Sequence, residues 1–324
     1  ANIQIQKTST YVQARRKVKY LYVSVWYALG SVIWTAFVMV TGHIFTQYVA
    51  GINQANLNWF FVHNVVGLIF TPLGVATAYY LIPKQLNTPI YSHKLSMIGF
   101  WVISFVYVWT GAHHMLHGPS ANWLETVASV FSFSLIIPVI AVITNFLGTF
   151  ASSPKEIRFD GPVPKFLMAG TIYYLLTCLQ GPLQAIPQFN VFISKNDYII
   201  GHAHMALLGA FSFFALAGVY YVIPKIVNRP LFDKKLGNTT FWIMAISTIP
   251  FFGSLFISGH IQGAMWLNPE NTFVQTLMAT KPWHIIRALS GGLIFFAYFL
   301  FLHNIIMTLL GKSKKNQEIT DLEM

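Results

Sequence analysis

The stretch that decides the fold is YIIGHAHMALLGAFSFFALAGVYYVI, residues 198–223, which contains no aspartate, glutamate, lysine or arginine. It is longer than the roughly 20 apolar residues that an α-helix needs to cross about 30 Å of hydrocarbon. Two histidines, His202 and His204, stand within it. Ionisable residues inside a membrane-spanning helix usually have a function, because burying them there is costly. The stretch therefore predicts a membrane protein with a site on this helix.

Seven more segments of this kind occur along the chain. Of its 324 residues, 55% are hydrophobic and 9% are charged, whereas a soluble domain has about 25% charged residues. This composition excludes a water-soluble globular domain and a disordered chain. The predicted spans are 20–48, 59–82, 95–116, 124–150, 166–189, 198–223, 239–262 and 284–310. We expect an all-α polytopic membrane protein, with a bundle over 20–310 between a basic arm at 1–19 and a tail at 311–324.

The lysines and arginines lie mostly on one side of this predicted bundle. Seventeen of the 20 fall in ends and loops on that side, and the other side keeps Lys195, Lys281 and Arg287. Because cytoplasmic loops carry an excess of positive charge, both termini are predicted to be cytoplasmic. The net charge of +11 thus reflects membrane topology. We expect a lipid bilayer as the environment and no nucleic-acid partner.

Five histidines on three predicted helices fall at a similar depth, in the outer third of the membrane. They are His63, His113, His114, His202 and His204. Neutral imidazole is a ligand that suits copper and iron. Because His202 and His204 are two residues apart, they project about 200° from each other on a helix and must serve two different centres. The other three form a set for a third metal, which requires local distortion of the helix near Gly111.

Several motifs occur in one order along the chain. They are Trp59-Phe-Phe-Val-His63-Asn64, Tyr79-Tyr80-Leu-Ile-Pro83-Lys84-Gln85, Tyr107-x5-His113-His114, Gly181-Pro182-Leu183, Gly201-His202-Ala-His204, Gln262-Gly263-Ala-Met265-Trp266 and Ile286-Arg287-Ala-Leu-Ser-Gly291-Gly292. Together they resemble the catalytic subunit of the heme–copper oxygen reductases, in particular the C family of high-affinity cytochrome c oxidases. The resemblance implies a respiratory enzyme in the cytoplasmic membrane of a bacterium or archaeon.

The resemblance also implies roles for single residues. His63, His113 and His114 would hold copper, His202 would be the axial ligand of a high-spin heme facing that copper, and His204 an axial ligand of a low-spin heme. Tyr107 falls where this branch has the tyrosine joined covalently to a copper-ligand histidine, here His63. Arg287 would pair with heme propionates. Neither His43 nor His260 occupies a ligand position of the family.

The implied function is reduction of dioxygen to water with electrons from cytochrome c, coupled to proton uptake from the cytoplasm. Other oxidase subunits, including a membrane-anchored cytochrome c, are the expected partners. All nine acidic residues are predicted to lie in loops, tails or a helix mouth, so a relay of buried carboxylates is not expected. The proton path would then use water and hydroxyl groups, with Tyr174, Tyr80, Thr177 and Ser104 as candidates.

Two departures from the family pattern keep an alternative open. The family's subunit has about four more helices at its N-terminus, one with the second low-spin heme ligand. We expect a partner chain to supply them, or the sequence to be a fragment or a specialised variant. Gln180 stands where this branch has the Glu of a Glu-Gly-Pro motif. The alternative is a nitric oxide reductase on the same scaffold, with nonheme iron in place of copper.

Two residues favour the oxidase over that alternative. The common nitric oxide reductases carry a Glu four residues after the first metal histidine, since hard iron favours a carboxylate ligand. That position is Gly67 in this chain. Those enzymes also lack the tyrosine that Tyr107 supplies. A transporter or a degenerate, non-enzymatic subunit is a third possibility, but all five ligand histidines are present, and inverted repeats or broken helices around a midplane site are not evident from the sequence.

Overall fold

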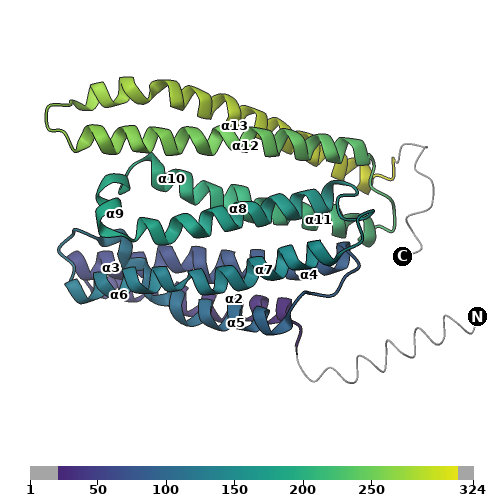
Figure 1. Cartoon of the computed structure of the whole chain (residues 1–324), viewed down its shortest axis with the longest axis horizontal. Helices are drawn as coiled ribbons and strands as arrows, with labels where there is room; N and C mark the ends of the chain where they lie inside the picture. The colour runs from purple at the N-terminus through teal and green to yellow at the C-terminus, as the bar shows by residue number, and fades with distance from the viewer. Residues whose placement is uncertain (1–20, 313–324) are drawn as a thin grey trace, which may run out of the picture.

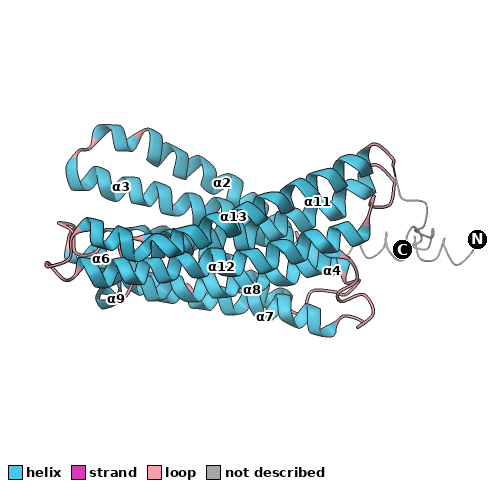
Figure 2. Cartoon of the chain, turned by 90° about the horizontal axis from the view of Figure 1, so that it is seen from above, coloured by secondary structure: helices cyan, strands magenta, loops and turns pink. Residues whose placement is uncertain are grey.

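The computed structural model describes residues 21–312, and the regular structure over this range is entirely helical (Figure 2). Eight helical segments are long and apolar enough to cross a membrane, as the sequence predicted. They are Val23–Tyr48, Gly51–Gln85, His93–Met115, Asn122–Ser152, Pro162–Gln184, Asp197–Ile226, Lys234–Trp266 and Phe273–Leu309. The predicted basic arm at 1–19 and residues 313–324 of the predicted tail lie outside the described residues.

The spans run side by side along one common axis, with the loops at the two ends (Figures 1 and 2). The first four consist of α2 (Val23–His43) and η1 (Phe45–Tyr48), of α3 (Gly51–Asn64), η2 (Val65–Phe70) and α4 (Thr71–Gln85), of α5 (His93–Val106) and η3 (Tyr107–Met115), and of α6 (Asn122–Ser134) and α7 (Ile136–Ser152). The beginning of α2 and the end of α13 (Phe273–Leu309) lie at the same end of the bundle. An even number of spans requires this arrangement.

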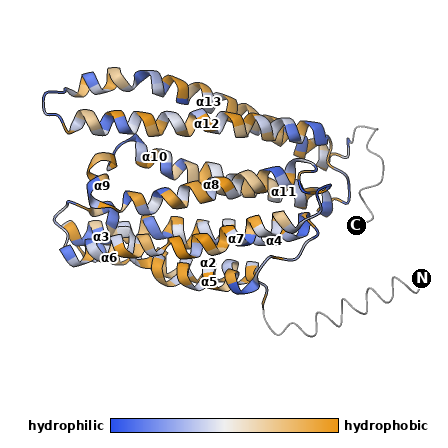
Figure 3. Cartoon of the chain, in the orientation of Figure 1, coloured by the Kyte–Doolittle hydropathy of each residue, from blue (hydrophilic) through white to orange (hydrophobic). Residues whose placement is uncertain are grey.

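The remaining spans are α8 (Pro162–Gln184), the broken helix made of α10 (Asp197–His204), η4 (Met205–Phe211) and α11 (Ser212–Ile226), and the long helices α12 (Lys234–Trp266) and α13. The short helix α9 (Pro187–Ile193) precedes α10. Hydrophobic residues fill the middle of the bundle and hydrophilic ones gather at its ends (Figure 3). Many large apolar side chains are exposed, among them Phe37, Ile249 and Leu289, and such a surface is suited to lipid.

Two helices begin earlier than the sequence predicted, which changes the depth of one site residue. The second span starts at Gly51 instead of 59, and α13 starts at Phe273 instead of 284. Hydropathy marks only the apolar part of a helix, whereas hydrogen bonding continues into polar turns. At α13, Thr272 and Gln275 form a capping box that begins the helix. His63 therefore lies 12 residues after the start of α3, whereas the predicted span 59–82 placed it four residues from the helix start.

An internal repeat relates the second and third spans to the sixth and seventh. Residues 79–101 match residues 220–242 at 11 of 23 positions, including Tyr-Tyr-x-Ile-Pro-Lys in both copies. The backbone repeats as well, because Asn87 and Asn228 have φ angles of 46° and 49°. The π-helical turns η2 and η4 also occupy equivalent places. With this offset of 141 residues, His63 corresponds to His204.

The fourth and eighth spans hold the repeated loops in the same way. Asn145 accepts a hydrogen bond from the backbone N–H of Ser92 at 2.8 Å, and Asn304 accepts one from that of Asp233 at 3.1 Å. One turn later, Thr149 and Thr308 accept from the residues just before these, at 3.1 and 3.0 Å. The chain is thus built from two similar sets of four spans, and each set has a histidine-bearing, π-bulged second span.

Candidate functional site

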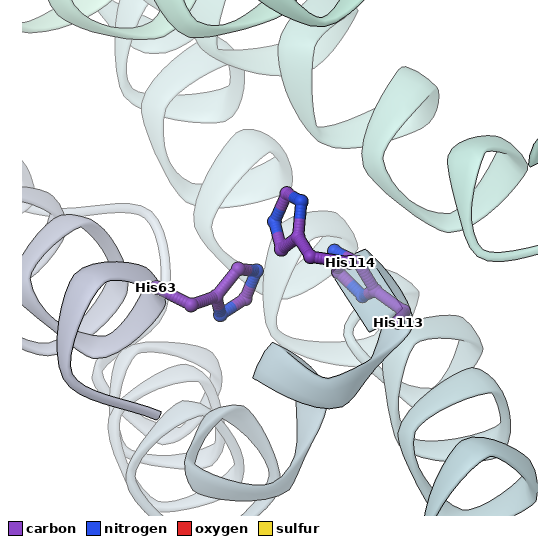
Figure 4. A group of neighbouring side chains, drawn as sticks. All are labelled: His63, His113 and His114. Atoms are coloured by element: carbon purple, nitrogen blue, oxygen red, sulfur yellow. The ribbon is translucent and has the colours of Figure 1, made fainter. Parts of the chain in front are cut away.

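Three of the predicted ligands come together inside the bundle. His63 projects from α3, and His113 and His114 project from η3 (Figure 4). One ring nitrogen of each lies within 4.8 Å of one of each of the others. The ring centroids are 4.7 Å apart for His63 and His113, 5.2 Å for His63 and His114, and 4.5 Å for the adjacent pair. This is a three-imidazole group that could hold one metal ion.

The local distortion predicted for the histidine pair is a change of helix type. At Tyr107 the α-helix α5 becomes the 3₁₀-helix η3. In a 3₁₀-helix, residues three apart lie above one another, so Tyr107, Thr110 and His113 share one edge. All three contact His63: the Tyr107 ring stacks on it at 4.7 Å, the Thr110 hydroxyl is 3.1 Å from Nδ1, and the His113 ring meets it edge-on.

Glycine at position 111 lets this edge approach α3 closely. A Cβ atom there would stand 2.7 Å from the backbone oxygen of Trp59 and 3.3 Å from the Cβ of His63. The Trp59 side chain in turn stacks on His114, with ring centroids 4.0 Å apart and planes 11° apart. The segment of α3 that contains Trp59 and His63 thus forms the surface against which η3 packs.

Two hydroxyl groups fix which ring nitrogens are available to a metal. Thr110 donates its proton to the carbonyl of Tyr107 at 2.7 Å, so it accepts from Nδ1–H of His63. Ser132 on α6 donates to the carbonyl of Ala128 at 2.6 Å, so it accepts from Nδ1–H of His113 at 2.8 Å. Metal-binding histidines are usually oriented by such a bond from the second nitrogen. Both Nε2 atoms remain free, and the donor set fits a metal that prefers imidazole, such as copper.

Gly67 and the Tyr107 ring compete for one position. Gly67 lies in η2, and a Cβ atom built on it would overlap the ring of Tyr107. A side chain at position 67, one α-helical turn beyond His63, is therefore incompatible with the present place of Tyr107. Gly67 and Tyr107 are therefore parts of one arrangement, although in the sequence they look independent.

A largely apolar cavity of about 310 Å³ adjoins the three histidines. Tyr107, His202, Tyr174 and Thr177 also line it, as does Cys178, which is a free cysteine. His202 comes from α10, and its Nδ1 lies 3.4 Å from the amide oxygen of Gln180 on α8. The cavity thus has an imidazole on a third helix beside the three-histidine group, as a planar cofactor facing a metal would require.

The predicted divergence of His202 and His204 agrees with their surroundings. His204 does not line the cavity: its side chain is exposed, its Nδ1 bonds to the carbonyl of Ile200 at 2.8 Å, and its ring lies 5.7 Å from that of Phe251 on α12. Arg287 on α13 is partly buried and forms no ion pair with the described residues. His43 and His260 are both exposed and contact aromatic rings.

The four predicted proton-path residues occupy different places. Tyr174 is buried and lines the cavity together with Thr177. Ser104 donates to the carbonyl of Phe100 at 2.8 Å and is not in the cavity wall, and the Tyr80 side chain is 46% exposed on the outside of α4. The buried tyrosine on α4 is the preceding one, Tyr79, whose hydroxyl accepts from Asn145 at 3.1 Å.

One carboxylate has a role that the sequence analysis missed. Asp197 is the first residue of α10 and is buried, with an exposed fraction of 8%. Its carboxylate is bound by side chains of α12 and α13. It stands just before the predicted span 198–223, so a loop position was predicted for it and its burial was not. Alternation of polar and glycine residues at 258, 259, 262 and 263 could have pointed to it, because these residues share one helix face.

An eight-span bundle with a three-histidine metal group, a tyrosine stacked on it and a further histidine in the same cavity defines a class of membrane-embedded redox metalloproteins. A family model described as cytochrome c and quinol oxidase polypeptide I matches residues 5–294 of the chain. The chain therefore belongs to the family of subunit I of the heme–copper oxidases.

Curated relatives and a solved structure agree with this membership. The chain is 31% identical over 300 residues to the Cbb3-type cytochrome c oxidase subunit CcoN1 of Stutzerimonas stutzeri, a match that covers 88% of this chain and 63% of that protein. It is 32% identical over 311 residues to a bacteroid cytochrome c oxidase subunit 1 homologue of Bradyrhizobium diazoefficiens, covering 91% and 56%. A heme–copper terminal oxidase dimer solved by cryo-electron microscopy superposes with a TM-score of 0.75 at 16% identity, covering 93% and 59%. The chain thus spans between 56% and 63% of the length of these proteins.

Proposed function

We propose that this chain is the catalytic core of a respiratory terminal oxidase that reduces dioxygen to water. Electrons would come from cytochrome c, and protons from the cytoplasm. His63, His113 and His114 would hold copper, and His202 would hold a high-spin heme in the adjoining cavity. When bound, these groups would supply the electron-transfer and oxygen-binding chemistry of the site.

The single observation that carries this proposal is the mutual exclusion of Tyr107 and a side chain at position 67. A nitric oxide reductase would need a carboxylate there for its iron, and the Tyr107 ring fills that space. Stacked on His63 at 4.7 Å, Tyr107 would be joined to that histidine. It would give one of the four electrons, and one proton, when the oxygen–oxygen bond is broken.

Protons would reach Tyr107 through buried hydroxyl groups that lead from the predicted cytoplasmic end. Tyr174 and Thr177 line the cavity, and the Thr177 hydroxyl is buried without a hydrogen-bond partner among the described residues. Within residues 21–312, the Tyr27 hydroxyl is likewise buried without a partner, and its ring lies 5.5 Å from that of Tyr79. Buried polar groups of this kind are usually satisfied by water. We therefore include Tyr79 and Tyr27 in the path and give Ser104 and Tyr80 a minor part.

The second electron-transfer site would be a low-spin heme on His204, with its propionates near Arg287. His204 is exposed, and a second axial ligand would come from a segment that packs against this side of the bundle. A partner chain with further helices would provide it, and a membrane-anchored cytochrome c subunit would deliver the electrons. Gly201, where a Cβ would lie 2.8 Å from Phe256, keeps α10 close to α12 on this side.

The test is a comparison of gas consumption by the purified, heme-loaded complex with one reduced donor. We expect fast uptake of dioxygen, slow uptake of nitric oxide, copper by metal analysis, and a covalent His63–Tyr107 peptide by mass spectrometry. Fast nitric oxide uptake with nonheme iron in place of copper would support the reductase instead. Uptake of neither gas, or a complex without heme bands, would contradict both.

A further inference from the structure

The carboxylate of Asp197 connects three spans at the outer end of the bundle. Its Oδ2 accepts hydrogen bonds from Ser258 on α12 at 2.6 Å, from Gln262 on α12 at 3.1 Å and from His284 on α13 at 2.8 Å. The oxygen of the Gln262 amide also accepts from the backbone N–H of Asp197 at 2.8 Å. Gln262 therefore binds Asp197 at two points. Hydrogen bonds to an ionised group are stronger than those between neutral groups.

Two glycines on α12 complete this contact. A Cβ atom at Gly259 would overlap the backbone nitrogen of Tyr198 on α10, and one at Gly263 would overlap the backbone oxygen of Phe192 on the preceding helix α9. Both glycines lie on the helix face that carries Ser258 and Gln262. The first turn of α10 is thus held directly against the backbone of α12, by hydrogen bonds and not by side-chain packing alone.

This contact sets the rotation of α10 about its own axis. Asp197 and Gly201 are four residues apart and lie on one face, and Gly201 also packs on α12, since a Cβ there would lie 3.0 Å from Leu255. Measured from Gly201, His202 projects about 100° to one side and His204 about 60° to the other. The face of α10 that contacts α12 therefore lies between the directions in which the two histidines project. Rotation of α10 would displace both of them from their centres at once.

A few contacts hold the start of α10 to its neighbours. α10 has 8 residues and is the first part of the continuous span Asp197–Ile226, in which the π-helical turn η4 follows it directly. The side-chain oxygen of Asn196 accepts from the N–H of Tyr198 at 2.9 Å, which satisfies the helix end but does not connect it to another span. The Tyr198 ring contacts Phe189 on α9 and Phe256 and His260 on α12. Asp197 adds hydrogen bonds to both α12 and α13.

We propose that Asp197 is a positioning residue for both heme ligands: with Ser258, Gln262 and His284 it fixes the rotation of α10, so that His202 points into the cavity and His204 toward the second heme. This inference rests on the proposed function for the identity of the two centres. It concerns a carboxylate that touches neither of them, and its effect reaches the hemes only through the helix.

The test compares Asp197→Asn and Asp197→Ala with Asp160→Asn in the purified complex. Asp160 is a matched control because its carboxylate also ties one segment to the start of another helix, by a 2.7 Å ion pair with Lys234, but lies on no histidine-bearing helix. The electron paramagnetic resonance spectrum of the oxidised low-spin heme is measured, since its g values depend on the orientation of the axial imidazole planes. Amide hydrogen exchange over 197–204 is measured in parallel.

We expect Asp197→Asn to shift these g values and to speed exchange in 197–204, with about 10-fold slower turnover, as is common when an outer-shell partner is lost. Asp197→Ala should lose part of the low-spin heme, and Asp160→Asn should match the wild type. Wild-type g values and exchange in both Asp197 variants, with both hemes bound, would overturn this inference alone. Absence of heme from the wild-type complex would refute the proposed function and this inference with it.

Discussion

Replacement of Thr110 by valine tests whether the geometry of the three-histidine group controls metal binding. Thr110 is fully buried, and its hydroxyl holds Nδ1 of His63 at 3.1 Å while it donates to the carbonyl of Tyr107. Valine has nearly the same shape, so no cavity forms and the packing of η3 on α3 is kept. The change leaves the Nδ1–H of His63 without an acceptor in a buried place. Such a loss costs about 1–3 kcal/mol.

That energy predicts a measurable loss of affinity. Since about 1.4 kcal/mol corresponds to a factor of ten, Thr110→Val should bind copper roughly 10- to 100-fold more weakly, which is also the range known for outer-shell partners. The assay is copper retention by the purified complex against a chelator of known affinity. Thr110→Ser keeps the hydroxyl and should retain copper. Thr126→Val removes a hydroxyl that bonds only to the backbone of its own helix, at Asn122, and should have no effect. Wild-type affinity in Thr110→Val would refute the reasoning, because the hydroxyl would then not hold the ring.

Three further substitutions test other parts of the structure. Gly67→Ala should displace the Tyr107 ring, because the added Cβ overlaps that ring and overpacking costs about 1–3 kcal/mol. The cross-linked peptide that contains His63 and Tyr107 should then no longer form, and its presence in this variant would contradict the prediction. Tyr79→Phe should slow dioxygen uptake without loss of heme, whereas Tyr80→Phe, on the exposed neighbour, should not; equal rates in the two variants would remove Tyr79 from the path. Asn145→Ala and Asn304→Ala should lower the melting temperature of the complex by similar amounts, because each removes the acceptor of a loop N–H in an equivalent place. A lower melting temperature in only one of them would mean that the two sets of spans are not equivalent in stability.

The sequence was sufficient for the architecture and for the members of the three-histidine group, because both depend on local patterns. Long apolar runs gave the eight spans, and imidazole in such runs indicated metal ligands. The need for a distorted helix followed from the adjacency of His113 and His114, and η3 confirms the distortion. Helix starts were less accurate, since the turns after Gly51 and Phe273 are polar or exposed and carry little hydropathic signal.

Relations between distant segments were beyond what the pattern could show. Gly67 was interpreted as the absence of a carboxylate, whereas in the structure it makes room for a ring that lies 40 positions later in the sequence. Asp197 was predicted to lie in a loop, and only the fold brings Ser258 and His284 to it. The repeat of Tyr-Tyr-x-Ile-Pro-Lys is visible in the sequence alone. That it reflects two structurally equivalent sets of spans is seen only from the matching hydrogen bonds that Asn145 and Asn304 accept from the two loops.

The repeat also explains why one half of the chain carries the three-histidine group. The equivalent of Tyr107 in the second set of spans is Thr248, whose hydroxyl bonds to Tyr173 at 2.6 Å, and α12 continues through this point as an α-helix. In the first set the corresponding helix changes to η3, which aligns Tyr107, Thr110 and His113 toward His63. His204, the counterpart of His63, therefore meets no histidine pair and stays exposed. A change of helix type in one copy is what separates the three-histidine group from the single histidine at the equivalent place in the other copy.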